Sequence, residues 1–206
     1  MVIREVGPEE LPAVGELRVR AYLAGGFLSP DSGYAPRLRA LGASDDGTVL
    51  IATDGGDQIA GTIMLAIWPR TGQVVTGPDE AEIRALAVAP GAQGQGIGRA
   101  LLDAAVARAA SQGARSVVLS TQPEMRAAHR IYERAGFTRL PDRDWSPDPE
   151  TTLLVYGLRL DAGPGRKLAP AESWPRLVGD STSPPGQALP AIRTGRAGSR
   201  RRAAGR

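Results

Sequence analysis

The hydrophobic and polar positions of residues 1–160 predict strands alternating with helices. Apolar runs of strand length, bounded by turn residues, predict strands at 2–6, 48–53, 58–67, 81–89, 116–120, 137–140 and 152–160. Helical spacing and helix-boundary residues predict helices at 8–22, 34–41 and 96–112, and a fourth that ends at Gly136. The resulting order, β-α-α-β-β-β-α-β-α-β-β, is typical of a mixed sheet of the α/β (α+β) class.

The fourth predicted helix carries a signal at each end. Thr121 and Glu124 have the spacing of a capping box, and Gly136 is a typical C-cap glycine. The apolar positions between them form a stripe on one face: Ala127, Ala128, Ile131, Tyr132 and Ala135.

Charge divides the chain of 206 residues, whose formal net charge is +3, into two parts. Residues 1–160 hold 16 Arg, no Lys and 19 acidic residues, a net charge of −3. Residues 161–206 hold nine basic and three acidic residues, a net charge of +6. We therefore expect a folded domain at 1–160 that is mildly acidic and a basic tail at 161–206.

The tail is rich in Pro, Gly and Arg and shows neither helical nor strand periodicity, so we expect it to be disordered. Its Arg triplet at 200–202 could contact phosphates, but no aromatic residue is interleaved with it. We do not expect a nucleic-acid partner.

The composition excludes several chemistries. The chain has no Cys and a single His, His129, so disulfides, thiolate metal sites, a cysteine nucleophile and a multi-histidine metal site are excluded, and we expect no metal. No run of 18 apolar residues exists and no apolar leader follows residues 1–4, so we expect no membrane contact and a cytoplasmic location.

The most informative segment is 81–102, where a predicted strand runs into a loop with glycines at 91, 94, 96 and 98 and then into a helix. Glycines allow close backbone approach, and free N–H groups at a helix N-terminus favour an anion such as pyrophosphate. A Walker loop is excluded because residues 1–160 lack lysine, and the glycine spacing does not match a Rossmann loop. A flexible glycine turn without a ligand remains the alternative.

At these residues the sequence resembles the GNAT-type N-acetyltransferases. Residues 93–98 match the family signature Q/R-x-x-G-x-G/A, 86–90 match the preceding Leu-Ala-Val-x-Pro, and 96–102 match Gly-Ile-Gly-x-x-Leu-Leu. A second family block, ending in Tyr-Glu-x-x-Gly-Phe, occurs at 128–137. The resemblance implies a strongly twisted mixed sheet of about six to seven strands flanked by about four helices.

The resemblance also implies a site for acetyl-CoA as cosubstrate. Its pyrophosphate would be held by Arg99 and by the backbone amides of Gln93, Gly94, Gln95, Gly96, Ile97 and Gly98. The pantetheine arm would pair with Leu86, Ala87 and Val88, on a strand that diverges from its neighbour at a bulge. A free amide near Val88 would polarise the thioester carbonyl.

Two residues are candidates for proton transfer. By its place in the family block, Tyr132 is the candidate general acid; the alternative is a core aromatic residue. Glu82 is the candidate general base, directly or through a water; the alternative is an ion pair with Arg84 on the same strand face. We interpret His129 as a solvated or cofactor-edge residue, and Met125 stands where the family often has Asn.

The acceptor end of the cleft would be flanked by residues 22–34 and 68–79, and Arg70, Asp79 and Glu80 could contact a substrate. The predicted function is transfer of an acetyl group from acetyl-CoA to a primary amine, by direct attack in a ternary complex. The acceptor could be a small molecule or a protein, and a homodimer is left open. The alternative is a non-catalytic acyl-CoA-binding or sensing module of the same fold.

Overall fold

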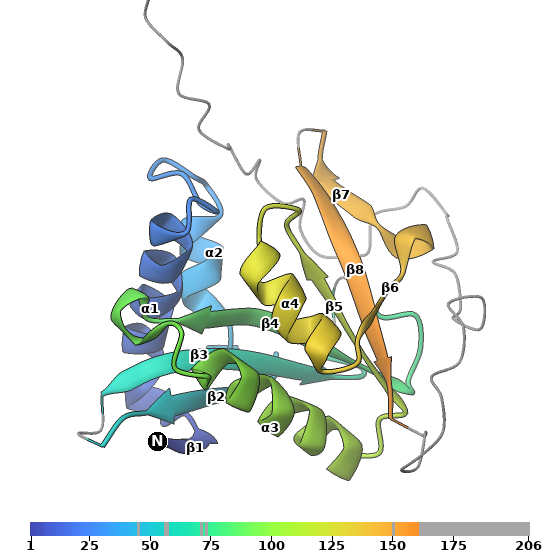
Figure 1. Cartoon of the computed structure of the whole chain (residues 1–206), viewed down its shortest axis with the longest axis horizontal. Helices are drawn as coiled ribbons and strands as arrows, with labels where there is room; N and C mark the ends of the chain where they lie inside the picture. Colours follow the sequence, from blue (N-terminus) through green and yellow to red (C-terminus); the bar gives the residue numbers. More distant parts are fainter. Residues whose placement is uncertain (45, 56–57, 71, 73, 150, 161–206) are drawn as a thin grey trace, which may run out of the picture.

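The computed structural model describes residues 1–160 except 45, 56–57, 71, 73 and 150 (Figure 1). The expectation of a disordered tail therefore lies outside the described residues. The strands are β1 (Val2–Glu5), β2 (Thr48–Thr53), β3 (Ile59–Ile67), β4 (Glu80–Val88), β5 (Ser116–Thr121), β6 (Thr138–Arg139), β7 (Trp145–Asp148) and β8 (Thr151–Arg159). The helices are α1 (Leu11–Ala24), α2 (Ala35–Ala40), α3 (Ile97–Ser111) and α4 (Arg126–Arg134).

The strands form one mixed sheet in the order β1-β2-β3-β4-β5-β8-β6, and β7 pairs with β8. Only β4 and β5 pair in parallel; the other pairs of described strands are antiparallel. The predicted α/β (α+β) class is confirmed. None of the helices in the described part has the length and apolar character needed to cross a bilayer.

Helices cover both faces of the sheet because the strand residues alternate between two cores. Leu50, Ile63 and Leu65 pack with residues of α3 and α4, which lie in front of the sheet in Figure 1. Val49 and Ile51 flank Leu50 in β2 and therefore face the other side of the sheet, where they pack with residues of α1 and α2. The sheet is therefore the middle layer, and the ends of its strands are free to carry a site.

The feature that creates the site is a local break in β4. Ala85 has a φ of +50°. Thr62 of β3 pairs with Ala87 and Met64 pairs with Arg84, so β4 has one more residue than β3 between these two pairs, which is a β-bulge. The parallel pairing of β4 with β5 ends at Ile83 and Leu119, so residues 84–88 pair only with β3. This is the bulged, diverging strand that the resemblance implied.

The last predicted helix was correct at its end and wrong at its start. Thr121 ends β5, and α4 begins five residues later behind Met125, with no side-chain cap, so the predicted capping box is not formed. Gly136 directly follows the C-cap residue, has a φ of +91°, and ends the helix as predicted. The strand β7, which contains Pro147, was not predicted.

Candidate functional site

A groove of about 540 Å³ opens where β4 leaves β5. Nine of the ten predicted cofactor residues line it: Leu86, Ala87, Val88, Gln93, Gly94, Gly96, Ile97, Gly98 and Arg99. Gln95 instead lines a neighbouring hollow with Met1 and Gln58. Opposite the loop, α1 contributes Ala21 and Tyr22, and α4 contributes Ala128 and Ile131. The groove therefore has one wall of strand and loop backbone and another of helix side chains.

The glycine loop leaves its backbone accessible from the groove. Gly94 and Gly96 have φ values of +79° and +81°, a conformation that favours glycine. A Cβ at either position would meet no atom within 4 Å, so the space beside them is open. Gly98 serves packing instead, since a Cβ there would lie 3.2 Å from Ile131 Cδ1 of α4. Because α3 begins at once behind Gly96, the loop has the geometry of an anion site.

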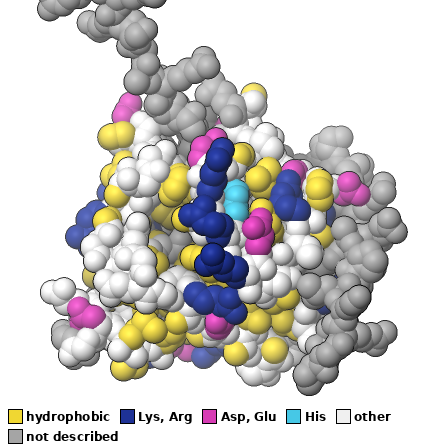
Figure 2. Space-filling view, in the orientation of Figure 1, with side chains coloured by type: hydrophobic (Ala, Val, Ile, Leu, Met, Phe, Trp, Pro, Cys, Tyr) yellow, Lys and Arg dark blue, Asp and Glu magenta, His cyan; other side chains and the backbone are white. Residues whose placement is uncertain are grey.

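Positive side chains border the groove. Arg126, Arg130 and Arg134 recur every four residues on α4, and Figure 2 shows a stripe of basic side chains over this helix. Arg99 is fixed by Asp103 at 2.8 Å and by a hydrogen bond of 3.0 Å from its Nη1 to the Arg134 carbonyl. Arg99 and Arg134 both line the groove. This border suits a ligand with several phosphates.

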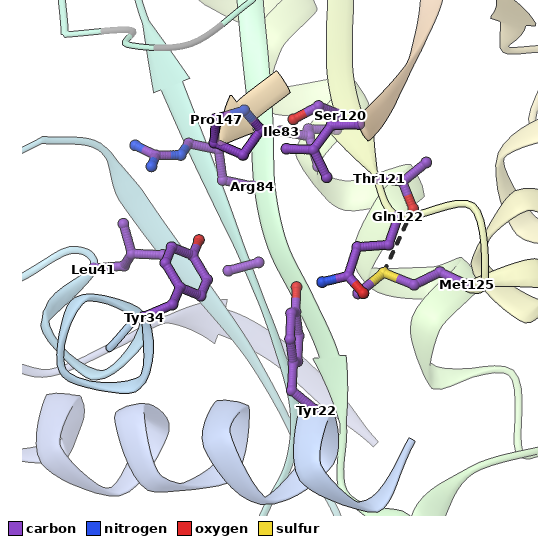
Figure 3. A pocket seen from close by; sticks show the side chains of 12 residues that line it. Tyr22, Tyr34, Leu41, Ile83, Arg84, Ser120, Thr121, Gln122, Met125 and Pro147 are labelled. Carbon is purple, nitrogen blue, oxygen red and sulfur yellow. Dashed lines mark hydrogen bonds between the residues drawn. The ribbon is translucent and has the colours of Figure 1, made fainter. Parts of the chain in front are cut away.

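A second cavity, here called the inner pocket, has a volume of about 70 Å³ and lies between α1, β4 and β5 (Figure 3). Its lining consists of Tyr22, Tyr34, Leu41, Ile83, Arg84, Ala85, Ser120, Thr121, Gln122, Met125, Pro147 and Leu153. Tyr22 and Met125 line both the inner pocket and the groove. The two cavities therefore lie next to each other at these two side chains.

Hydrogen bonds hold the wall of the inner pocket together. Gln122 Nε2 donates to the Phe27 carbonyl at 3.0 Å, which ties the end of β5 to the segment after α1. The Gln122 carbonyl lies 3.0 Å from Nε2 of His129. Burial raises the pKa of Tyr22, and the nearby hydroxyls of Tyr34 and Tyr132 raise it further. Tyr22 is therefore a protonated donor at neutral pH.

Tyr132 lies on the inner side of α4 and is 6% exposed. Its ring centroid lies 6.0 Å from those of Phe137 and Tyr156, so the side chain packs in the core, and it lines neither cavity. Burial raises the pKa of its hydroxyl, which is near enough to influence the pKa of Tyr22. The structure thus gives Tyr132 a packing role, and its predicted role as the acid stays a prediction.

Glu82 is fully buried beside the inner pocket. Its Oε2 accepts a hydrogen bond of 3.0 Å from the Gly72 amide, and the residue lines neither cavity. Within the described residues, Arg84 forms no ion pair with it, so the predicted alternative of a Glu82–Arg84 pair is not found. Its predicted role as the base stays a prediction.

The residues expected at the acceptor end of the cleft are only partly brought to the two cavities. Tyr22 and Tyr34, at the ends of the predicted flanking segment, do line the inner pocket. Glu80 is wrong as a substrate contact: both its carboxylate oxygens are bound to the buried Arg143, at 2.9 and 2.8 Å. Arg70 and Asp79 line neither cavity. No cluster of His, Cys, Asp or Glu suited to a metal ion occurs among the described residues.

Sequence reasoning missed the polar run Ser120, Thr121 and Gln122 in the wall of the inner pocket. These residues lie at the carboxyl end of the strand that pairs in parallel with β4. Ligand sites in α/β sheets gather at such strand ends, and that rule could have found them. Pro147 and Leu153 gave no comparable signal, because β7 and β8 reach the pocket only through the tertiary fold.

Comparison with known proteins points to one family. The family model described as acetyltransferase (GNAT) family matches residues 12–137. A curated relative, the mycothiol acetyltransferase of Beutenbergia cavernae, is 36% identical over 94 residues, which are 46% of this chain and 29% of that protein. The chain thus spans less than a third of the length of this relative.

Solved structures share the fold. An acetyltransferase of the GNAT family from Staphylococcus aureus Mu50 superposes with a TM-score of 0.61 at 19% identity, covering 77% of this chain and 98% of that one. A putative acetyltransferase from Salmonella typhimurium, solved with its cofactor acetyl-CoA, gives 0.58 at 21% identity, covering 82% and 99%.

Proposed function

Because the chain belongs to the acetyltransferase (GNAT) family, we propose that it transfers an acetyl group from acetyl-CoA to a primary amine by direct attack within a ternary complex. One observation carries the proposal: the groove beside the glycine loop and the inner pocket are neighbours that share the lining residues Tyr22 and Met125. Two substrates can therefore meet there without a covalent enzyme intermediate.

The groove residues fit the proposed cosubstrate. Open space beside Gly94 and Gly96 lets backbone amides approach a pyrophosphate, and Arg99 and Arg134 add positive charge at the border. Residues 86–88 have no strand on their β5 side, so this edge can bind an extended pantetheine arm through main-chain hydrogen bonds. A solved neighbour of the same fold holds acetyl-CoA. Acetyl-CoA supplies the thioester carbonyl that the amine attacks.

The remaining chemistry is proton transfer, since the amine must lose a proton and the thiolate must gain one. We assign the acid to Tyr132, whose raised pKa keeps its hydroxyl protonated. Tyr22 is a second candidate because it lines both cavities and its pKa is raised as well. Glu82 is assigned as the base, acting through a water because it lines neither cavity.

The curated relative is named mycothiol acetyltransferase, but the matched part is under a third of its length. This name supports acetyl transfer by the present chain, but it does not identify the acceptor of the present chain. The alternative, a non-catalytic acyl-CoA sensor, would need the same groove. An assay that follows release of the CoA thiol over a panel of primary amines distinguishes them. Amine-dependent release supports the transferase, whereas acetyl-CoA binding without release on any amine supports the sensor.

A further inference from the structure

Arg84 in the wall of the inner pocket and Arg18 behind that wall carry side-chain nitrogens without a hydrogen-bond partner. Arg18 of α1 is fully buried; its Nη1 donates to the carbonyl of Leu41, a lining residue, at 2.6 Å, and its Nε and Nη2 have no partner. Arg84 of β4 lines the pocket directly, and its buried Nη2 also has no partner. Within the described part of the chain, neither guanidinium forms an ion pair.

Both groups are cations that influence each other. Burial, and to a smaller extent the charge of Arg84, lower the pKa of Arg18 to about 10, while Tyr22, Asp46 and Tyr34 act to raise it; Arg18 stays charged at neutral pH. Asp46 attracts the Arg18 cation only at a distance, because no ion pair joins them among the described residues and its carboxylate accepts from the Gly42 amide; the Glu82 carboxylate accepts from the Gly72 amide. Arg18 is fully buried and Arg84 is half-buried, so the unpartnered nitrogens of both side chains are costly.

The chain shows elsewhere how it satisfies a structural buried arginine. Arg143 is 1% exposed, and its two terminal nitrogens bind both carboxylate oxygens of Glu80. Among the described residues, neither Arg18 nor Arg84 is paired with a carboxylate in this way, and Arg84, unlike Arg143, lies in the wall of the inner pocket. An unpartnered guanidinium nitrogen in the wall of a cavity indicates that a ligand supplies its partner.

We propose that the inner pocket binds the carboxylate of the acceptor, so that the acceptor is a small molecule carrying both an amino group and a carboxylate. This inference rests on the proposed acetyl transfer. Arg84 holds the carboxylate, and Arg18 adds positive charge from behind. Figure 3 shows the hydroxyls of Tyr22 and Tyr34 and the amide of Gln122 turned toward the middle of the pocket, where they are additional polar partners.

The size and position of the pocket agree with this assignment. A volume of about 70 Å³ suits a carboxylate with its neighbouring carbon atoms rather than a folded protein surface. With the carboxylate at Arg84, the amino end of a short molecule points to the junction at Tyr22 and Met125. The amine is thereby directed toward the groove, which is where the proposed thioester lies.

The first test compares free L-amino acids with their carboxamides, which keep the amine and lose the charge. We expect the wild-type protein to acetylate the acids with a kcat/KM about tenfold or more above that of the amides. Arg84→Gln should lower kcat/KM for the acids by on the order of 10- to 100-fold, the effect of one charge-assisted hydrogen-bonding partner, and leave the amides within about twofold. Arg20→Gln is the matched control, because Arg20 is an exposed arginine of α1 that lines neither cavity, and it should change neither value.

A second test measures binding without turnover. Free amino acids, added without acetyl-CoA, should raise the Tm of the wild-type protein and of Arg20→Gln but not that of Arg84→Gln. Aminophosphonates in place of amino acids show whether the pocket prefers a carboxylate or a phosphonate. Equal effects of acids and amides, or equal losses on both in Arg84→Gln, would overturn the inference.

The two tests separate this inference from the proposed function. Arg84-dependent binding of amino acids without acetylation of any amine would retain the carboxylate site and reject the transferase. Acetylation that favours amines without a carboxylate would retain the transferase and reject the carboxylate site.

Discussion

Replacing Gly96 by Ala tests the glycine loop because the chain contains a matched control. Gly96 and Gly113 have nearly equal φ values, +81° and +86°, and a Cβ at either would meet no atom within 4 Å. Both Ala variants therefore suffer the same left-handed backbone strain, about 1 kcal/mol or slightly more. For a protein of this size, that strain lowers Tm by about 2–4 °C in each variant.

The two variants should differ only in ligand binding. Gly96 lines the groove and Gly113 does not, so only the Cβ of Gly96→Ala occupies the space that a pyrophosphate would use. Loss of one charge-assisted hydrogen bond predicts a drop in acetyl-CoA affinity of roughly 10- to 100-fold. Gly96→Glu adds charge repulsion and should abolish binding.

The measurements are thermal unfolding of both variants and calorimetric titration with acetyl-CoA. We expect equal losses of Tm and a loss of affinity confined to Gly96→Ala. If Gly96→Ala bound acetyl-CoA as tightly as Gly113→Ala does, the assignment of the loop as the pyrophosphate site would be refuted.

Three further substitutions test individual residues. Tyr132→Phe should lower kcat by ~100-fold or more if the hydroxyl is the acid, with acetyl-CoA affinity unchanged by titration; wild-type turnover would return the residue to a packing role. Glu82→Gln should lower kcat and remove the acidic limb of its pH profile, and an unchanged profile would exclude it as the base. Glu80→Gln should cost about 3–5 kcal/mol in denaturant unfolding, against under about 1 kcal/mol for the exposed ion-pair control Glu16→Gln. Although burial alone would raise the pKa of Glu80, hydrogen bonds from its buried arginine lower it below 4.5. Its contribution is therefore complete above pH 4.5 and is lost as pH falls through the folded pKa, where the stability of Glu80→Gln should converge on that of the wild type.

The parts predictable from the sequence are those with local physical causes. The loop at Gly94 and Gly96 could be predicted because its left-handed backbone favours glycine. The strand before it and the helix after it could be predicted from their apolar periodicity. The end of α4 at Gly136 could be predicted for the same reason, since this residue also has a positive φ. These features placed nine of ten predicted residues in the wall of the groove.

The parts that were not predicted depend on contacts between distant segments. The inner pocket joins residues of α1, β4, β5 and β7, and no local pattern brings Arg18 near Arg84. The Thr121–Glu124 spacing predicted a cap, but β5 continues through Thr121, so the ladder with β8 takes its backbone groups instead. β7 is short and contains proline, which obscured its strand pattern.

Acetyl transfer to an amine can be followed by mass spectrometry of amines incubated with isotopically labelled acetyl-CoA. We predict that the label appears on the nitrogen of amines that carry a carboxylate, and that Gly96→Glu, which cannot bind the cosubstrate, gives no labelled product. Labelled amine at the same rate with Gly96→Glu, or no labelled amine from a wild-type protein that binds acetyl-CoA, would contradict the account.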